Sequence, residues 1–162
     1  MGGLADWLRN FRDLHERARQ GALKQGEHAT YLTRRDELAR AMLAAHKLTL
    51  KPGETPRRAL RVARALQVDI EVRGMSQRTV TLDLSTAGFS AMLARPPALG
   101  ELVGVTLRLP GAESLACRAR VTEVKPLSGS IRIAAQYLDL SAADLERLEM
   151  FVIDTVLGLF TT

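Results

Sequence analysis

The sequence has almost none of the residues that build covalent cross-links. Cys117 is the single cysteine among 162 residues, so no disulfide can form within the chain and a reducing compartment is expected. No apolar run reaches the roughly 18 residues that a membrane-spanning helix needs. The amino terminus carries charges throughout and lacks the apolar stretch of a secretory signal. These absences predict a soluble cytoplasmic protein without a membrane span.

The usual signatures of catalysis and metal binding are also missing. There is no P-loop, no GxGxxG following a strand and no GxSxG, and no His, Cys and Asp residues stand at metal-ligand spacing. Cys117 alternates with small apolar residues, as a core residue of a strand does, and is not expected to be a nucleophile. The sequence therefore predicts no enzyme, no metal site and no cofactor.

The apolar residues of the first fifty positions follow a helical period. Residues 3–20 and 28–47 each place an apolar stripe on one face, and glycines separate the two stretches. Two prolines and a glycine then interrupt the pattern in KPGETP, residues 51–56. This organisation predicts a helical hairpin over residues 1–50 followed by a linker over 51–56.

Beyond the linker the period of the apolar residues changes from about 3.6 to 2. Six stretches alternate in this way with turn residues between most of them: 67–74, 77–83, 88–94, 102–109, 115–124 and 130–138. An apolar helix is expected to follow at 141–160. Short strands at such spacing favour a small antiparallel barrel. The predicted fold is mainly β with flanking helices (α+β): a domain over 57–162, formed by a six-stranded antiparallel barrel and a C-terminal helix, preceded by the helical hairpin.

Two local patterns bear polar chemistry. PRRALR at 56–61 contains Arg-x-x-x-Arg just before the first expected strand, and DLSTAG at 83–88 is Asp-x-Ser-x-x-Gly between the second and third. Taken separately, each has a structural explanation. The first is compatible with a solvated basic linker, and the second with a hairpin turn in which Gly88 takes a positive φ.

Together, and in this order, the two patterns resemble the PilZ domain family of bacterial cyclic di-GMP receptors. Arg57 and Arg61 match the family's first motif, and Asp83, Ser85 and Gly88 match its second. The resemblance covers about 57–160, including the last expected strand and the closing helix.

The chain departs from the family pattern at one position. Family members often carry a further arginine just before the first motif, where this chain has Pro56, while its extra arginine, Arg58, lies inside the motif. Arg58 is included among the candidate contacts, and the number of ligand molecules bound stays open.

The resemblance implies a non-catalytic receptor in second-messenger signalling, of the kind linked to motility and biofilms. Cyclic di-GMP carries two phosphates and two guanines, and guanidinium groups of Arg57, Arg58 and Arg61 suit both. An ionised Asp83 accepts hydrogen bonds from guanine N–H groups. Ser85 would bond the backbone or a phosphate, and glycine in the same turn permits close approach. The ligand is thus expected at these residues, and no other cofactor is implied.

Three further interpretations concern partners. A PilZ-like scaffold acting only through protein contacts, in motility or surface-polysaccharide machinery, is the main alternative. Nucleic-acid binding by the basic stretch 57–78 is disfavoured, because aromatic residues are lacking near its arginines and Asp69 and Glu71 are acidic. The apolar stripes of residues 1–50 predict intramolecular packing, contact with a protein partner or self-association.

A second Leu-Asp-Leu-Ser stretch occurs at 138–141, and it is expected to have a different role from the first. It lacks the glycine, and an apolar helix begins directly after it. Ser141 is therefore predicted to cap that helix, with Asp144 three residues on.

Overall fold

The computed structural model describes residues 3–53 and 59–160, which divide into two compact units. One unit comprises residues up to 60 together with 153 onward, and the other comprises Arg61–Val152. The domain boundaries expected from the sequence stay a prediction. Within the described ranges, no helix is long and apolar enough to cross a membrane.

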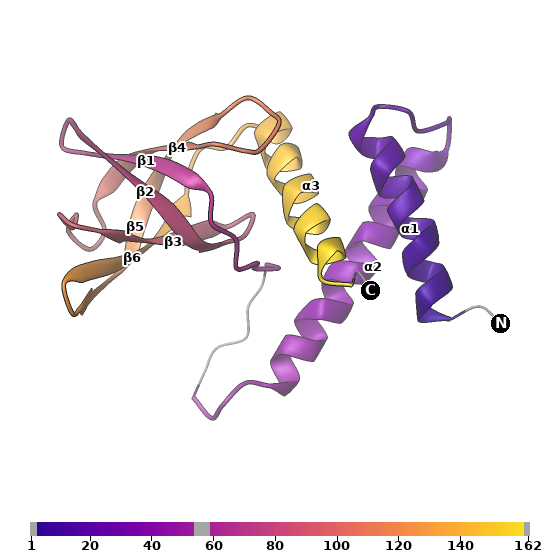
Figure 1. Cartoon of the computed structure of the whole chain (residues 1–162), viewed down its shortest axis with the longest axis horizontal. Coiled ribbons are helices and arrows are strands. Elements are labelled where there is room, and N and C mark those ends of the chain that lie inside the picture. Colours follow the sequence, from indigo (N-terminus) through magenta and orange to yellow (C-terminus); the bar gives the residue numbers. More distant parts are fainter. Residues whose placement is uncertain (1–2, 54–58, 161–162) are drawn as a thin grey trace. The chain divides into compact units, whose positions relative to one another are not determined.

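The first unit contains two helices, α1 (Leu4–Arg19) and α2 (Glu27–Leu48), as the sequence predicts (Figure 1). They pack through aromatic rings, because Phe11 of α1 stacks on Tyr31 of α2 with centroids 5.8 Å apart. His15 lies in the same contact, and its Nδ1 shares a 2.8 Å hydrogen bond with the Tyr31 hydroxyl. All three residues are buried, so they form the core of the hairpin.

The second unit is a closed antiparallel barrel of six strands, which confirms the expected fold (Figure 1). Its strands are β1 (Gln67–Val72), β2 (Met75–Leu84), β3 (Gly88–Leu93), β4 (Leu102–Leu107), β5 (Leu115–Leu127) and β6 (Ser130–Tyr137). They pair in the order β1-β2-β3-β6-β5-β4, and β1 also pairs with β4 to close the barrel. Inward side chains are aliphatic with few exceptions, as expected for a chain with 4% aromatic residues.

A short segment before β1, residues 61–66, is hydrogen-bonded to the C-terminal part of β2. Val62 and Leu84 exchange both backbone hydrogen bonds, each 2.9 Å long. The Thr81 hydroxyl accepts from Leu66 N–H and donates to the carbonyl of Arg64. These bonds fix the path of residues 61–66 along β2 and thereby place Arg61.

The chain closes with α3 (Ala142–Gly158). Ser141 caps it as predicted, because its Oγ accepts a 3.0 Å hydrogen bond from Asp144 N–H. Leu148, Val152, Ile153 and Val156 of this helix are buried. The boundary between the two units falls within the helix, between residues 152 and 153.

Candidate functional site

The polar centre of the barrel unit is Asp83, near the end of β2. Its Oδ1 accepts hydrogen bonds from Arg61 Nη1 at 2.9 Å and from Ser90 Oγ at 2.8 Å. Its Oδ2 lies 3.6 Å from Nη2 of Arg132. Each carboxylate oxygen thus lies next to one guanidinium group. The two arginines come from segments that are far apart in the sequence.

The strand ladder explains how these residues meet. Asp83 pairs with Ser90 across β2 and β3, next to a register shift between Thr81 and Asp83. Such a bulge re-aims a side chain. Arg132 stands on β6, the other neighbour of β3, so its side chain reaches across β3 to the carboxylate. Arg61 belongs to the segment 61–66, which is hydrogen-bonded to β2.

The three charged side chains are only partly open to solvent. Asp83 exposes 19% of its side chain, Arg61 27% and Arg132 41%. An ion pair that is shielded to this degree is screened less by salt than one on the open surface. A ligand that approached from solvent would meet the two guanidinium groups more readily than the carboxylate.

The turn that follows β2 is organised by Ser85, which is 1% exposed. Its Oγ accepts hydrogen bonds from the N–H groups of Ala87, at 3.0 Å, and Gly88, at 3.2 Å. Its own N–H donates to the carbonyl of Gly88 at 2.8 Å. The serine hydroxyl is therefore committed to the backbone, which was one of the two roles expected from the sequence.

Gly88 is required for a reason other than a positive φ. It is absent from the glycines with φ in the left-handed region, so that part of the sequence interpretation is wrong. Gly88 pairs with Gln136 of β6, and a Cβ at this position would overlap the carbonyl oxygen of Ala135. Close approach of β3 to β6 therefore demands glycine.

Of the six residues expected at the site, the structure describes four: Arg61, Asp83, Ser85 and Gly88. It brings Arg61 into contact with Asp83 and makes Ser85 and Gly88 the supports of the adjoining turn. Arg57 and Arg58 lie outside the described residues. Sequence reasoning missed Ser90 and Arg132, because their contact with Asp83 depends on the pairing of β3 with β2 and β6.

A buried hydroxyl lies close to this cluster. Tyr137, in β6, donates its N–H to the carbonyl of Ala87 and stacks its ring on Phe89. Its hydroxyl has no hydrogen-bond partner among the residues that the structure describes. Burial raises the pKa of Tyr137, and the nearby Arg61 partly opposes this effect. The phenol is therefore neutral at physiological pH.

The cluster has the chemistry of a polar binding site. It offers a carboxylate that can accept N–H donors and guanidinium groups that can bond anions or the O6 and N7 edge of guanine. Groups of three or more His, Cys, Asp or Glu residues that could hold a metal ion do not occur in residues 3–53 and 59–160. Recognition of a ligand with both donors and negative charge suits these groups best.

The closed barrel, the arginine that precedes it and the helix that follows it can now be compared with known protein families. Residues 55–154 match the model of the PilZ domain, and the chain belongs to the PilZ domain family. This result confirms the resemblance recognised from the two motifs.

Solved structures of low sequence identity share the fold. The inhibitor of motility MotI/DgrA of Bacillus subtilis is 22% identical, with a TM-score of 0.60 over 69% of this chain and 59% of that one. The PilZ domain of Escherichia coli YcgR with c-di-GMP is 14% identical, with a TM-score of 0.55 over 65% and 95%.

MrkH of K. pneumonia in complex with c-di-GMP is 21% identical, with a TM-score of 0.55 over 65% of this chain and 55% of that one. The chain thus spans less than two thirds of the MotI and MrkH chains. Comparison with curated protein sequences gave no match.

Proposed function

We propose that this protein is a non-catalytic, cytoplasmic receptor for cyclic di-GMP. The observation that carries the proposal is the 2.9 Å bond between Arg61 and Asp83. It joins the Arg-x-x-x-Arg segment to the Asp-x-Ser-x-x-Gly turn on a PilZ barrel. Support also comes from the family itself and from similar folds described with c-di-GMP bound.

Each proposed contact follows from the chemistry of the groups. Asp83 would accept hydrogen bonds from the N1–H and N2 amine of a guanine. Arg57, Arg58 and Arg61 would bond phosphate oxygens or the O6 and N7 atoms of guanine. Ser85 and Gly88 would act mainly by holding the turn next to Asp83, since the Ser85 hydroxyl is buried and already bonded.

Arg132 joins this set as a residue outside both motifs. Its guanidinium is 41% exposed and 3.6 Å from Asp83, a longer and weaker pairing than that of Arg61. It would therefore be available to an anionic ligand at a small cost in lost internal bonding.

Ligand binding would exchange partners at the carboxylate. Without ligand, Asp83 neutralises Arg61. When guanine donors take over the carboxylate, Arg61 becomes free to contact the ligand's negative charge. Arg61 is also the first residue of the barrel unit, and the residues up to 60 belong to the helical unit. We propose that rearranging this segment couples binding to a conformational change or to contact with a protein partner, or a second copy of the chain, through residues 1–50.

Calorimetric titration of the purified full chain with cyclic di-GMP tests the proposal. We expect saturable binding that Arg61→Ala and Asp83→Ala each weaken at least about tenfold, as expected for loss of a charge-assisted bond. Arg57→Ala, Arg58→Ala and Arg132→Gln should also weaken it. Absence of heat at micromolar ligand, or unchanged affinity in the Arg61 and Asp83 variants, would refute the receptor.

The barrel offers a matched control for these variants. Asp69 of β1 is likewise held by two arginines, Arg78 and Arg108, each at 3.0 Å, and exposes 20% of its side chain. This second cluster matches the first in its charged groups and in the exposure of its aspartate, has more exposed arginines, and belongs to neither motif. Arg108→Ala should therefore leave the affinity for cyclic di-GMP unchanged.

The alternative is a PilZ-like scaffold that binds no nucleotide and acts through protein contacts in motility or surface-polysaccharide machinery. One observation favours it: Asp83 is already satisfied internally by Arg61 and Ser90. In that case the cluster around Asp83 serves only to stabilise the barrel. Asp83→Ala would then lower stability, and the wild-type chain would give no titration signal.

A further inference from the structure

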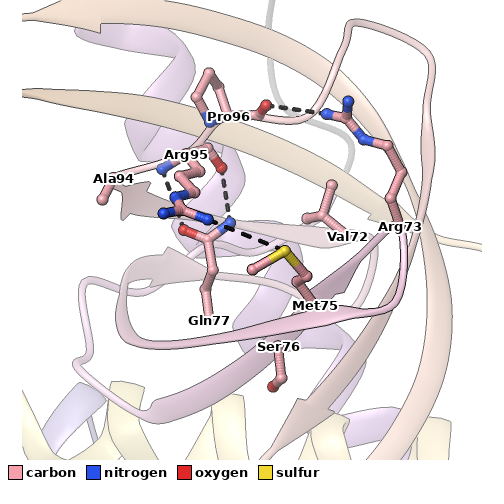
Figure 2. Close-up of a pocket in the computed structure, with 8 residues that line it drawn as sticks. All are labelled: Val72, Arg73, Met75, Ser76, Gln77, Ala94, Arg95 and Pro96. Carbon is pink, nitrogen blue, oxygen red and sulfur yellow. Dashed lines mark hydrogen bonds between the residues drawn. The ribbon is translucent and has the colours of Figure 1, made fainter.

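A second polar site lies at the other end of β2. A cavity of about 610 Å³ is lined by the β1–β2 turn and by the residues that follow β3: Val72, Arg73, Met75, Ser76, Gln77, Ala94, Arg95 and Pro96 (Figure 2). Its volume is in the range of ligand sites. Met75 precedes Asp83 by eight strand positions, which is roughly 25 Å at about 3.3 Å per residue. This cavity is therefore separate from the Asp83 cluster.

Gln77 fixes one wall of the cavity. Its side-chain Nε2 donates to the carbonyl of Arg95 at 2.7 Å, and its Oε1 accepts from Arg95 N–H at 3.2 Å (Figure 2). The amide thus pairs with the main chain of Arg95 as a neighbouring strand would. The position of Arg95 is consequently set by its backbone and does not depend on its own side chain.

The guanidinium of Arg95 carries an uncompensated charge. Among the described residues no carboxylate lies within 4.0 Å of it, and its side chain is directed along the Met75 thioether, with Nη1 4.0 Å from Sδ (Figure 2). By contrast, Arg78 and Arg108 on the same barrel each bond Asp69. The exposed guanidinium of Arg95 lies beside the Met75 thioether and has no neutralising partner in the part of the chain that the structure describes, so it can bind an anion.

Arg73 fixes the opposite wall at a conformational cost. Its φ is 52°, and it forms a two-residue hairpin turn with Gly74, whose φ is 82°. Left-handed backbone is uncommon for a residue other than glycine. The side chain pairs with Glu101 at 3.2 Å and donates to the carbonyl of Pro96 at 3.4 Å. Arg73 is thus neutralised, and the net charge of the cavity comes from Arg95.

Apolar surface beside this charge indicates the kind of ligand. Met75 is 58% exposed, and Ala94 and Pro96 add further apolar atoms to the lining of the cavity. A small hydrophilic anion would leave these side chains in water. We propose that the cavity is a docking site for a segment of a protein partner that presents a carboxylate next to an apolar side chain. The carboxylate would pair with Arg95, and the apolar group would pack on Met75.

The test uses the ¹⁵N-labelled full chain and a defined probe, an acetylated and amidated peptide of alternating Glu and Leu. We expect saturable amide shifts in residues 72–77 and at Ala94 and Arg95. Arg95→Gln should weaken binding about tenfold, the value of one charge-assisted bond. Arg108→Gln removes the same charge from another face and should have no effect. Because Gln77 bonds only the main chain of residue 95, Arg95→Gln keeps the loop, as unchanged shifts elsewhere will verify.

A peptide of alternating Gln and Leu separates charge from apolar contact. It should bind at least about tenfold more weakly than the Glu peptide. Equal binding of the two peptides, full affinity in Arg95→Gln, or no saturable shifts with the Glu peptide would each overturn the docking site. None of these outcomes depends on whether the chain binds cyclic di-GMP.

Discussion

Ser85 and Ser141 stand at the same position of two Leu-Asp-Leu-Ser segments, yet their hydroxyls meet different surroundings. Ser85 is 1% exposed and accepts from two backbone N–H groups in the turn after β2. Ser141 is exposed and accepts from one N–H group at the start of α3. Buried donors that lose their acceptor cannot turn to water, whereas exposed ones can.

Replacing each serine by alanine should therefore have unequal effects on stability. Ser85→Ala leaves the buried N–H of Gly88 without its acceptor, and removes a part-buried bond from Ala87, so it should lower the free energy of unfolding by about 1–3 kcal/mol. Ser141→Ala removes an exposed helix cap and should cost about 1 kcal/mol. Urea unfolding of both variants measures the difference. Only Ser85→Ala should also weaken cyclic di-GMP binding, and a larger stability loss in Ser141→Ala would contradict this assignment.

Gly88 allows a second prediction at the scale of one residue. A Cβ there would overlap the carbonyl of Ala135, so Gly88→Ala must push β3 away from β6 and should cost about 1–3 kcal/mol. Gly104, in β4, is the matched control, because its Cβ would meet only the Glu71 side chain at 3.4 Å. Gly104→Ala should change the free energy of unfolding by less than about 1 kcal/mol. Equal costs in urea unfolding would show that the β3–β6 approach is not the reason for glycine.

The sequence was sufficient to name the motif residues but not their contacts. The family resemblance assigns Arg61 and Asp83 to one ligand site but does not predict the bond between them, and the bond of Ser90 and the approach of Arg132 depend on strand register. A register shift beside Asp83 decides which side chains share its face, and such a shift leaves no periodic signal in the sequence. The sequence interpretation of Gly88 is wrong for the same reason. The atom that a Cβ would overlap, the carbonyl oxygen of Ala135, belongs to another strand, β6.

Elements were predicted more accurately than contacts. All six strands and three helices appear within a few residues of their expected bounds, because alternation and helical periodicity are local properties. The segment before β1 was not expected to pair with anything. Its bonds to β2 rely on Thr81 and on the Val62–Leu84 bridge, which are long-range features.

Within the helical elements, His15 makes stability dependent on pH. Burial lowers its pKa from 6.5, and Asp154, whose Oδ1 is 3.4 Å from Nε2, only partly opposes this effect. Arg19 and Glu16 are the other charged groups acting on it. The unfolded chain therefore binds the proton more readily than the folded chain. Stability is full above about pH 6.5 and falls as the pH drops toward the lowered pKa.

Unfolding in urea at about pH 7 and pH 5 tests this dependence. The single tryptophan, Trp7, lies in α1, so its fluorescence reports the unfolding of the helical unit. We expect the midpoint to fall at the lower pH, and His15→Gln to reduce that fall. His28→Gln, at an exposed position of α2, serves as the control and should behave as the wild type. A midpoint that rises on acidification would reverse the sign and refute the assignment.

At the scale of the whole molecule, α3 runs through the boundary between the two compact units, which falls between residues 152 and 153. Its residues Leu148, Val152, Ile153 and Val156 are all buried. Because helix formation is cooperative along the chain, we expect fraying on one side of this boundary to weaken the helix on the other. The two units are therefore expected to unfold together, although neither periodicity nor motif indicates this in the sequence.

Ligand linkage provides the test of that cooperativity. Cyclic di-GMP at about 100 times its dissociation constant should raise the free energy of unfolding by about 2.7 kcal/mol, because it binds the folded barrel and not the unfolded chain. If α3 couples the units, the fluorescence midpoint of Trp7 will shift together with the calorimetric transition. In Arg61→Ala, whose dissociation constant should be at least about tenfold higher, the same ligand concentration should add no more than about 1.4 kcal/mol, so both shifts should be smaller. A barrel transition that moves while the Trp7 midpoint stays in place would mean that binding is not transmitted to the helical unit. The proposed output through residues 1–50 would then lose its physical basis.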